Sequence, residues 1–179
     1  MAVKPPEDVL DAVAAAVAPA RSGRVGLRWE QRERYHLTLQ FLGPVPSLAA
    51  VVDGLAAAVA GQAAFPVRLG GAGAFPKPGR ARVVWIGAAV GASDLVALAG
   101  AVAGGLRAHG YEPDRKEFHP HLTLARLKVP DNVADVLAAI GPAPAGEAFT
   151  VSEVVLYQSQ LSSKGPTYTV LERFLLRGA

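Results

Sequence analysis

Two segments of the chain contain the same tetrapeptide, His-Leu-Thr-Leu. It starts at His36 in RYHLTLQFLG (residues 34–43) and at His121 in FHPHLTLARL (residues 118–127), which together use two of the four histidines. Near neutral pH an imidazole can accept or donate a proton, because the ordinary pKa of histidine is about 6.5. A threonine hydroxyl can donate a hydrogen bond to a phosphate oxygen. Two such pairs facing one cleft could cleave a phosphodiester by acid–base chemistry, without a metal ion.

The spacing within each motif fits a β-strand. Side chains alternate between the two faces of a strand, so His36 and Thr38 share one face and Leu37 points to the other. The same alternation places His121 and Thr123 together. We expect the leucines to be buried in a core and the two His–Thr pairs to face each other across a cleft.

A longer repeat surrounds the motifs, with a period of about 85 residues. In each copy a strand leads through Val-Pro to a predicted helix-capping residue, Ser47 or Asp131, and then to an amphipathic helix. A strand that starts with Phe-x-Val follows each helix, at Phe65 in FPVRL and at Phe149 in FTVSEVVLY. A repeat of this length predicts two similar lobes, not a solenoid.

Further helices are expected upstream of the motifs, over Glu7–Val17 and Asp94–His109, and GAGAFPKPGRAR (residues 71–82) is the segment most typical of a loop. These elements predict an α+β fold with two antiparallel sheets, flanking helices and a central cleft. We expect a single bilobal domain over residues 1–179, with a pseudo-twofold repeat roughly over 1–80 and 81–179.

The composition is that of a packed globular protein, with 51% hydrophobic and 18% charged residues. The absence of cysteine excludes disulfides, thiol nucleophiles and thiolate zinc sites, and favours the cytoplasm. A net charge of +3 suits an anionic ligand such as a phosphate or a nucleic acid. The apolar run Ile86–Leu106 contains a helix start at Ser93, so we expect a strand end, a turn and a helix there and no membrane span.

Several polar residues also have simpler interpretations. A lone histidine on a strand is more often a surface or core residue, and only the duplication favours chemistry at both positions. His119 and His121 form an H-x-H pair that could bind a metal, yet no other cluster of Asp, Glu or His supplies further ligands, so we expect no metal site. His109 precedes Gly110 and is expected at a helix C-terminus. The runs RWEQRERY and DRKEF are expected to be solvated loops whose arginines could line a basic rim.

On these motifs the chain resembles the two-histidine (2H) phosphoesterase superfamily, and most closely its LigT-like RNA 2',3'-cyclic phosphodiesterases, also called the 2'-5' RNA ligase family. The resemblance extends over nearly the whole chain, through PPEDVLDAV, LTLQFLG, GAFPKPGRARVVWIG, FHPHLTLAR and LYQSQLSSKGPTYTVLERF. It implies a hydrolase without a cofactor that opens 2',3'-cyclic phosphate ends of RNA, or of nucleotides, to 2'-phosphates.

Carried onto this chain, the resemblance makes His121 the base that activates water and His36 the acid that protonates the departing O3', although a pseudo-symmetric site could exchange these roles. Thr38, Thr123 and Arg126 would bind the phosphate. Arginine at a strand end is, however, commonly a surface residue. Phe41 and Tyr157 are candidate base-stacking groups, although either could belong to the core.

Two departures from the family pattern stand out. Relatives usually open with a strand such as Arg-Leu-Phe before the Pro-Pro segment, whereas here only MAVK stands there, so we expect the first strand to be missing, clipped or very short. Gln160 stands where relatives often have a basic residue.

Two alternative functions stay open: 2'-5' ligation or cleavage by the same histidines, and a non-catalytic nucleotide- or RNA-binding module. We expect a monomer with no obligate protein partner, because the duplicated lobes already supply both motifs.

Overall fold

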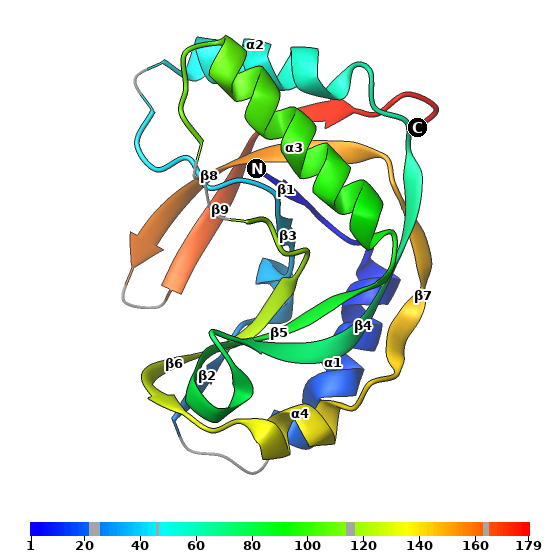
Figure 1. The fold of residues 1–179 in the computed structure, drawn as a ribbon, viewed down its shortest axis with the longest axis vertical. Coiled ribbons are helices and arrows are strands. Elements are labelled where there is room, and N and C mark those ends of the chain that lie inside the picture. Colours follow the sequence, from blue (N-terminus) through cyan, green and yellow to red (C-terminus); the bar gives the residue numbers. More distant parts are fainter. Residues whose placement is uncertain (22–25, 46, 114–116, 163–164) are drawn as a thin grey trace.

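The structure is a computed structural model and describes residues 1–21, 26–45, 47–113, 117–162 and 165–179 (Figure 1). Four α-helices, two 3-10 turns and nine strands are assigned within these ranges. In chain order they are β1 (Ala2–Val3), α1 (Glu7–Arg21), β2 (Leu27–Trp29), η1 (Arg32–Arg34), β3 (Leu37–Thr38), α2 (Leu48–Val59), β4 (Phe65–Phe75), η2 (Pro78–Arg80), β5 (Ala81–Val90), α3 (Ala92–Ala108), β6 (Leu122–Asp131), α4 (Ala134–Ile140), β7 (Pro144–Val151), β8 (Glu153–Ser162) and β9 (Gly165–Leu175).

One continuous path of hydrogen-bonded strands runs through both lobes. It reads β7-β4-β5-β6 in one lobe and continues as β3-β1-β8-β9 in the other, with β2 alongside β6. The two strands that carry the motifs, β6 and β3, are therefore central neighbours, and the fold is α+β, antiparallel and bilobal as predicted. The two predicted sheets are joined at this point, because the register pair Leu37–Leu122 connects them into one hydrogen-bonded path.

Each lobe combines segments from both halves of the chain. Helix α1 packs with α4 and β7, whereas α2 packs against α3 and contacts β9 (Figure 1). Large apolar side chains from these helices, such as Leu10, Leu55 and Leu98, are almost completely buried in a common core. The first strand is very short, as predicted: Ala2 and Val3 pair with Thr38 and Leu37, and Ala2 also pairs with Val155 of β8.

Local capping is predicted correctly in one repeat and wrongly in the other. Ser47 caps α2, since its Oγ accepts a hydrogen bond from the Ala50 amide at 3.3 Å. Asp131 is instead the last residue of β6, which continues past the Val-Pro step. The side chain of Asn132 accepts the bond from the Ala134 amide, at 3.0 Å, where α4 begins.

The segment predicted as a loop over residues 71–82 is mostly strand. Residues 71–75 finish β4, residues 81 and 82 start β5, and η2 lies between them. Gly73 is opposite Trp85 in this hairpin, and the indole ring occupies the space where a side chain would stand. Gly73 therefore accommodates a large neighbour, whereas Gly79 lies in η2, the turn between the two strands. The predicted strand at Phe149 is likewise divided at Ser152 into β7 and β8.

The long apolar run Ile86–Leu106 divides as expected, into the end of β5, a turn at Gly91 and helix α3. In the described ranges, no helix has the length and apolar character needed to cross a bilayer. Pro46 of the first Val-Pro step and residues 114–116 of DRKEF lie outside the described residues.

Candidate active site

The two motif strands alternate as the sequence predicts. Leu37 and Leu122 are fully buried where β3 meets β6, and Leu39 and Leu124 are buried beyond them. The histidine and threonine of each motif are half-buried. The leucines therefore anchor both strands in the core, and the polar pairs face the cleft between the lobes.

The cleft has two adjoining compartments. A wide compartment of about 320 Å³ contains His121, and a narrow compartment of about 40 Å³ contains His36. Four residues line both of them: Thr38, Phe41, Thr123 and Arg126. The two imidazoles thus lie on either side of a shared group of two hydroxyls, one guanidinium and one aromatic ring.

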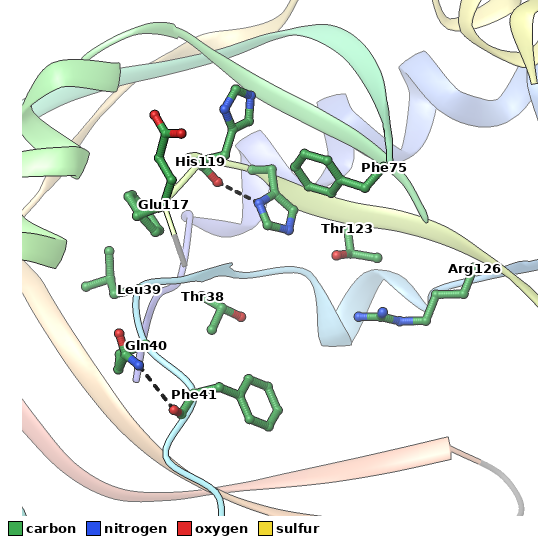
Figure 2. A pocket seen from close by; sticks show the side chains of 11 residues that line it. Thr38, Leu39, Gln40, Phe41, Phe75, Glu117, His119, Thr123 and Arg126 are labelled. Carbon is green, nitrogen blue, oxygen red and sulfur yellow. Dashed lines mark hydrogen bonds between the residues drawn. The ribbon is translucent and has the colours of Figure 1, made fainter. Parts of the chain in front are cut away.

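Figure 2 shows how the wide compartment is walled. Phe75 and Phe41 lie on opposite sides of it, and Thr38 and Thr123 lie between them. Arg126 lies at the end away from Glu117. Phe41 is 68% exposed, so it belongs to the wall of the cleft and not to the core.

Both histidines make the same kind of hydrogen bond, to the backbone carbonyl two residues earlier in the chain. Nδ1 of His36 lies 2.7 Å from the carbonyl oxygen of Arg34, and Nδ1 of His121 lies 2.7 Å from that of His119, drawn as a dashed line in Figure 2. A carbonyl oxygen only accepts hydrogen bonds, so Nδ1 carries the proton in each ring. This tautomer leaves Nε2 as the nitrogen that can exchange a proton with a ligand.

Burial lowers the pKa of both histidines below the ordinary value. For His36 and His121 the loss of solvation is the main cause, and the bond to the backbone carbonyl opposes it. The positive charge of Arg126 lowers both pKa values further. In the free protein at pH 7 the neutral form is therefore favoured at both sites.

Aromatic rings pack against both histidines. His36 packs edge-on against Tyr168 with 5.0 Å between ring centroids, and Tyr157 lies 6.2 Å away. His121 packs edge-on against Phe75 at 5.0 Å, and Trp85 lies 6.3 Å away. Each imidazole thus has two aromatic neighbours, supplied by β8 and β9 in one lobe and by β4 and β5 in the other.

Arg126 is positioned by a carboxylate on the neighbouring strand segment. Its Nε lies 3.3 Å from Oε1 of Glu30, whose backbone amide donates a hydrogen bond of 2.8 Å to the carbonyl of Leu124. The Arg126 side chain is 58% exposed, so most of the guanidinium stays accessible from the cleft. This contact orients the cation and leaves donors for a ligand.

The structure brings six of the predicted site residues together in the cleft: His36, Thr38, Phe41, His121, Thr123 and Arg126. Tyr157 lies beside His36 without lining either compartment. The sequence reasoning missed Tyr168, Phe75 and Trp85, which come from other strands, and Glu30, which follows β2; none of them carries a local signal. Of the basic rim expected from RWEQRERY, Arg34 lines the narrow compartment.

His119 and Glu117 line the wide compartment. Over the described part of the chain, no group of three or more His, Asp or Glu side chains could hold a metal ion. His109 ends helix α3, where its Nδ1 lies 2.9 Å from the carbonyl of Gly105. It therefore has the helix-terminal position that was expected.

Comparisons with known proteins agree with this geometry. A family model described as the 2'-5' RNA ligase superfamily matches residues 8–162. The RNA 2',3'-cyclic phosphodiesterase of Aeropyrum pernix is 37% identical over 150 residues, which cover 82% of this chain and 85% of the relative. That of Thermus thermophilus is 37% identical over 183 residues, covering 97% and 87%.

Solved structures are similar over almost the full length. The crystal structure of TT0787 from Thermus thermophilus has a TM-score of 0.80 and 34% identity, and the match covers 99% of this chain and 96% of that one. LigT of E. coli, solved with 3'-AMP, has a TM-score of 0.76 and 27% identity, with 98% and 95% covered. Together with the paired histidine motifs across one cleft, these matches show that the chain belongs to the 2'-5' RNA ligase superfamily of two-histidine phosphoesterases.

Proposed function

We propose that this protein hydrolyses 2',3'-cyclic phosphate ends of RNA to 2'-phosphates, with His36 and His121 as an acid–base pair. The observation that carries the proposal is the position of the two imidazoles on either side of Thr38, Thr123 and Arg126. Relatives that match most of the chain are named for this activity, and LigT was solved with a nucleotide.

The first step is activation of water. Neutral His121 accepts a proton from water through Nε2, because its Nδ1–H is already donated to the backbone. The water oxygen forms a bond to phosphorus while the P–O3' bond breaks on the opposite side. Two histidines on either side of the phosphate suit this in-line geometry.

The second histidine completes the proton balance. Protonated His36 gives its Nε2 proton to the departing O3', which leaves a free 3'-hydroxyl and a 2'-phosphate. Burial lowers the pKa of His36, and a bound phosphate anion opposes that shift, so the charged acid is favoured once substrate is present. Afterwards His121 holds the extra proton, and exchange with solvent restores both rings.

The phosphate is held by two hydroxyl groups and one guanidinium group. The hydroxyls of Thr38 and Thr123 donate hydrogen bonds to the two non-bridging oxygens, whose charge changes during the reaction. Arg126 adds a positive charge at the same place, positioned by Glu30. The nucleobase stacks on Phe41, which is exposed at the wall of the wide compartment. Tyr157, which contacts His36, contributes to packing of the acid more directly than to stacking.

The lobes act together as one bilobal domain over residues 1–179, because each supplies one half of the catalytic pair. We expect the protein to be a cytoplasmic monomer without an obligate protein partner or a cofactor. The lack of cysteine and the presence of both motifs in one chain support this expectation. Since the same histidines can serve the reverse reaction, 2'-5' ligation or cleavage is a secondary activity to assay.

The product identifies the reaction. Incubation with adenosine 2',3'-cyclic phosphate in EDTA, followed by phosphorus NMR, should give adenosine 2'-phosphate as the single product. Formation of the 3'-phosphate would contradict the assignment of O3' as leaving group. Loss of turnover in EDTA would contradict the metal-independent mechanism.

A further inference from the structure

Three arginines extend from the phosphate site toward Gly165, the first residue of β9. Arg126 lines both compartments, and Arg34 lines the narrow one beside His36. Arg28 continues the row, because it is opposite Arg126 in the antiparallel pairing of β2 with β6. Residues in direct cross-strand register lie side by side on the same face of a sheet.

The outer two arginines approach the same point. A side-chain carbon on Gly165 would lie 3.1 Å from Nη2 of Arg28 and still closer to Nη1 of Arg34. Gly165 has a φ of +105°, which favours glycine, and without a side chain there the space is left to the two guanidinium groups. Two cations therefore converge a short way beyond the narrow compartment.

Among the described residues that line the narrow compartment, basic side chains outnumber acidic ones. Of the described residues that line the narrow compartment, Glu30 is the acidic one, and it is already paired with Arg126. Tyr168 packs against His36 and is close enough to Arg126 and Arg34 for both charges to oppose the rise in its pKa that burial and Glu30 cause. A chain of phosphates passing this end of the cleft meets a concentration of positive charge.

We propose that Arg28 and Arg34 form a second phosphate subsite, which binds the phosphate on the 5' side of the terminal nucleoside. The proposal rests on the function proposed above, because it takes the cyclic phosphate to lie at Thr38, Thr123 and Arg126. In an RNA end, the other phosphate attached to the last nucleoside is at its 5' oxygen. The preferred substrate is therefore an RNA end, or a nucleotide with a 5'-phosphate, and not a nucleoside 2',3'-cyclic phosphate with a free 5'-hydroxyl.

Three substrates separate the contribution of the second phosphate from that of the rest of the RNA. Adenosine 2',3'-cyclic phosphate lacks the second phosphate, the same compound with a 5'-phosphate adds it alone, and the dinucleotide UpA 2',3'-cyclic phosphate adds it within a phosphodiester. We expect kcat/KM to be at least about tenfold higher for the last two. In Arg28→Gln this advantage should fall by about tenfold, and the dependence of the dinucleotide reaction on salt should weaken by about one phosphate contact.

Arg28 is the informative position, because it is exposed and lines neither compartment, whereas Arg34 is close to His36. Arg107→Gln, on the exposed surface of α3, removes the same charge away from the cleft and should keep the wild-type preference. The subsite is wrong if Arg28→Gln keeps the full preference, or if a 5'-phosphate alone gives no advantage. It is also wrong if Arg28→Gln lowers the rate with all three substrates equally.

Binding provides a readout that does not need turnover. Calorimetry with adenosine 2'-phosphate and with adenosine 2',5'-bisphosphate should show tighter binding of the bisphosphate by wild type, by about tenfold, and a reduced difference in Arg28→Gln. If wild type hydrolyses none of the cyclic substrates, the proposed function fails, and this binding difference still decides the subsite. Equal affinities for both products would overturn it.

Discussion

Gly73 and Trp85 provide a sharp test of how His121, the proposed general base, is supported. The two residues are opposite each other in the β4–β5 hairpin. A carbon added at Gly73 would lie closer than 3.0 Å to three atoms of the Trp85 ring, a separation that real side-chain carbons essentially never show. The ring also packs against His119, with 5.1 Å between centroids, and lies near His121. Gly73→Ala must therefore displace a ring of the wall behind His121.

The loss of stability expected for Gly73→Ala follows from overpacking. Forcing one methyl group into filled space typically destabilises a protein by roughly 1–3 kcal/mol. For a chain of this length each kcal/mol lowers Tm by about 2–4 °C, so we expect a loss of about 2–12 °C. Displacement of an active-site group by about 1 Å can cost a factor of about 100 in rate, so kcat with a cyclic nucleotide should also fall by about 10- to 100-fold.

The matched control is Gly104→Ala in α3, where the added carbon would have no neighbour within 4 Å beyond the adjoining residues and backbone of the helix itself. An exposed helical glycine replaced by alanine should gain about 0.5–1 kcal/mol, with unchanged kcat. Thermal unfolding and steady-state rates of both variants complete the assay. Wild-type Tm and kcat in Gly73→Ala would refute the claim that the indole ring fills the space above Gly73.

The remaining predictions concern the cleft itself. Because burial lowers the pKa of His36 and His121, kcat/KM of the free enzyme should be bell-shaped with its maximum below pH 6.5; a maximum above pH 7.5 would contradict those shifts. The same shifts affect stability: below pH 6.5 the unfolded chain binds more protons than the folded one, so the free energy of unfolding is highest above that pH and decreases as pH falls through the lowered pKa values. Urea unfolding of wild type and of a variant with both histidines replaced by Gln would measure this difference. Thr123→Val keeps the shape of the side chain but removes one phosphate donor, and kcat should fall by about 10- to 1,000-fold without a lower Tm; an unchanged rate would exclude the hydroxyl from transition-state binding. Phe41→Ala should weaken nucleotide binding by about 5- to 100-fold in calorimetry, with little change in Tm because the ring is exposed, whereas a large loss of Tm would place the ring in the core.

The central pair could be predicted from the sequence because its signal is local and duplicated. Alternation along a strand separates His36 and Thr38 from the buried Leu37, whatever the rest of the fold does. The repeat then places His121 in the equivalent position. Neither inference requires knowledge of which strands are neighbours.

The surroundings of the pair could not be predicted in the same way. Tyr168, Phe75 and Trp85 reach the histidines from β9, β4 and β5, and such contacts depend on strand order and register across the sheet. Asp131 was expected to cap a helix, but β6 pairs with β5 as far as Ala81, and this pairing outweighs the local capping preference. Gly73 contributed to the prediction of a loop, because the pairing that places the Trp85 ring over it cannot be read from the local sequence.

The central claim is that His36 and His121 act as one unit, and a cycle of the two single variants and the double variant tests it most directly. We expect His36→Ala and His121→Ala each to lose at least about 1,000-fold in kcat on adenosine 2',3'-cyclic phosphate, and the double variant to be little worse than either. His109→Ala, which changes an exposed histidine at the end of α3, should keep the wild-type rate. A single variant with full activity, or losses that multiply in the double variant, would contradict a concerted two-histidine mechanism.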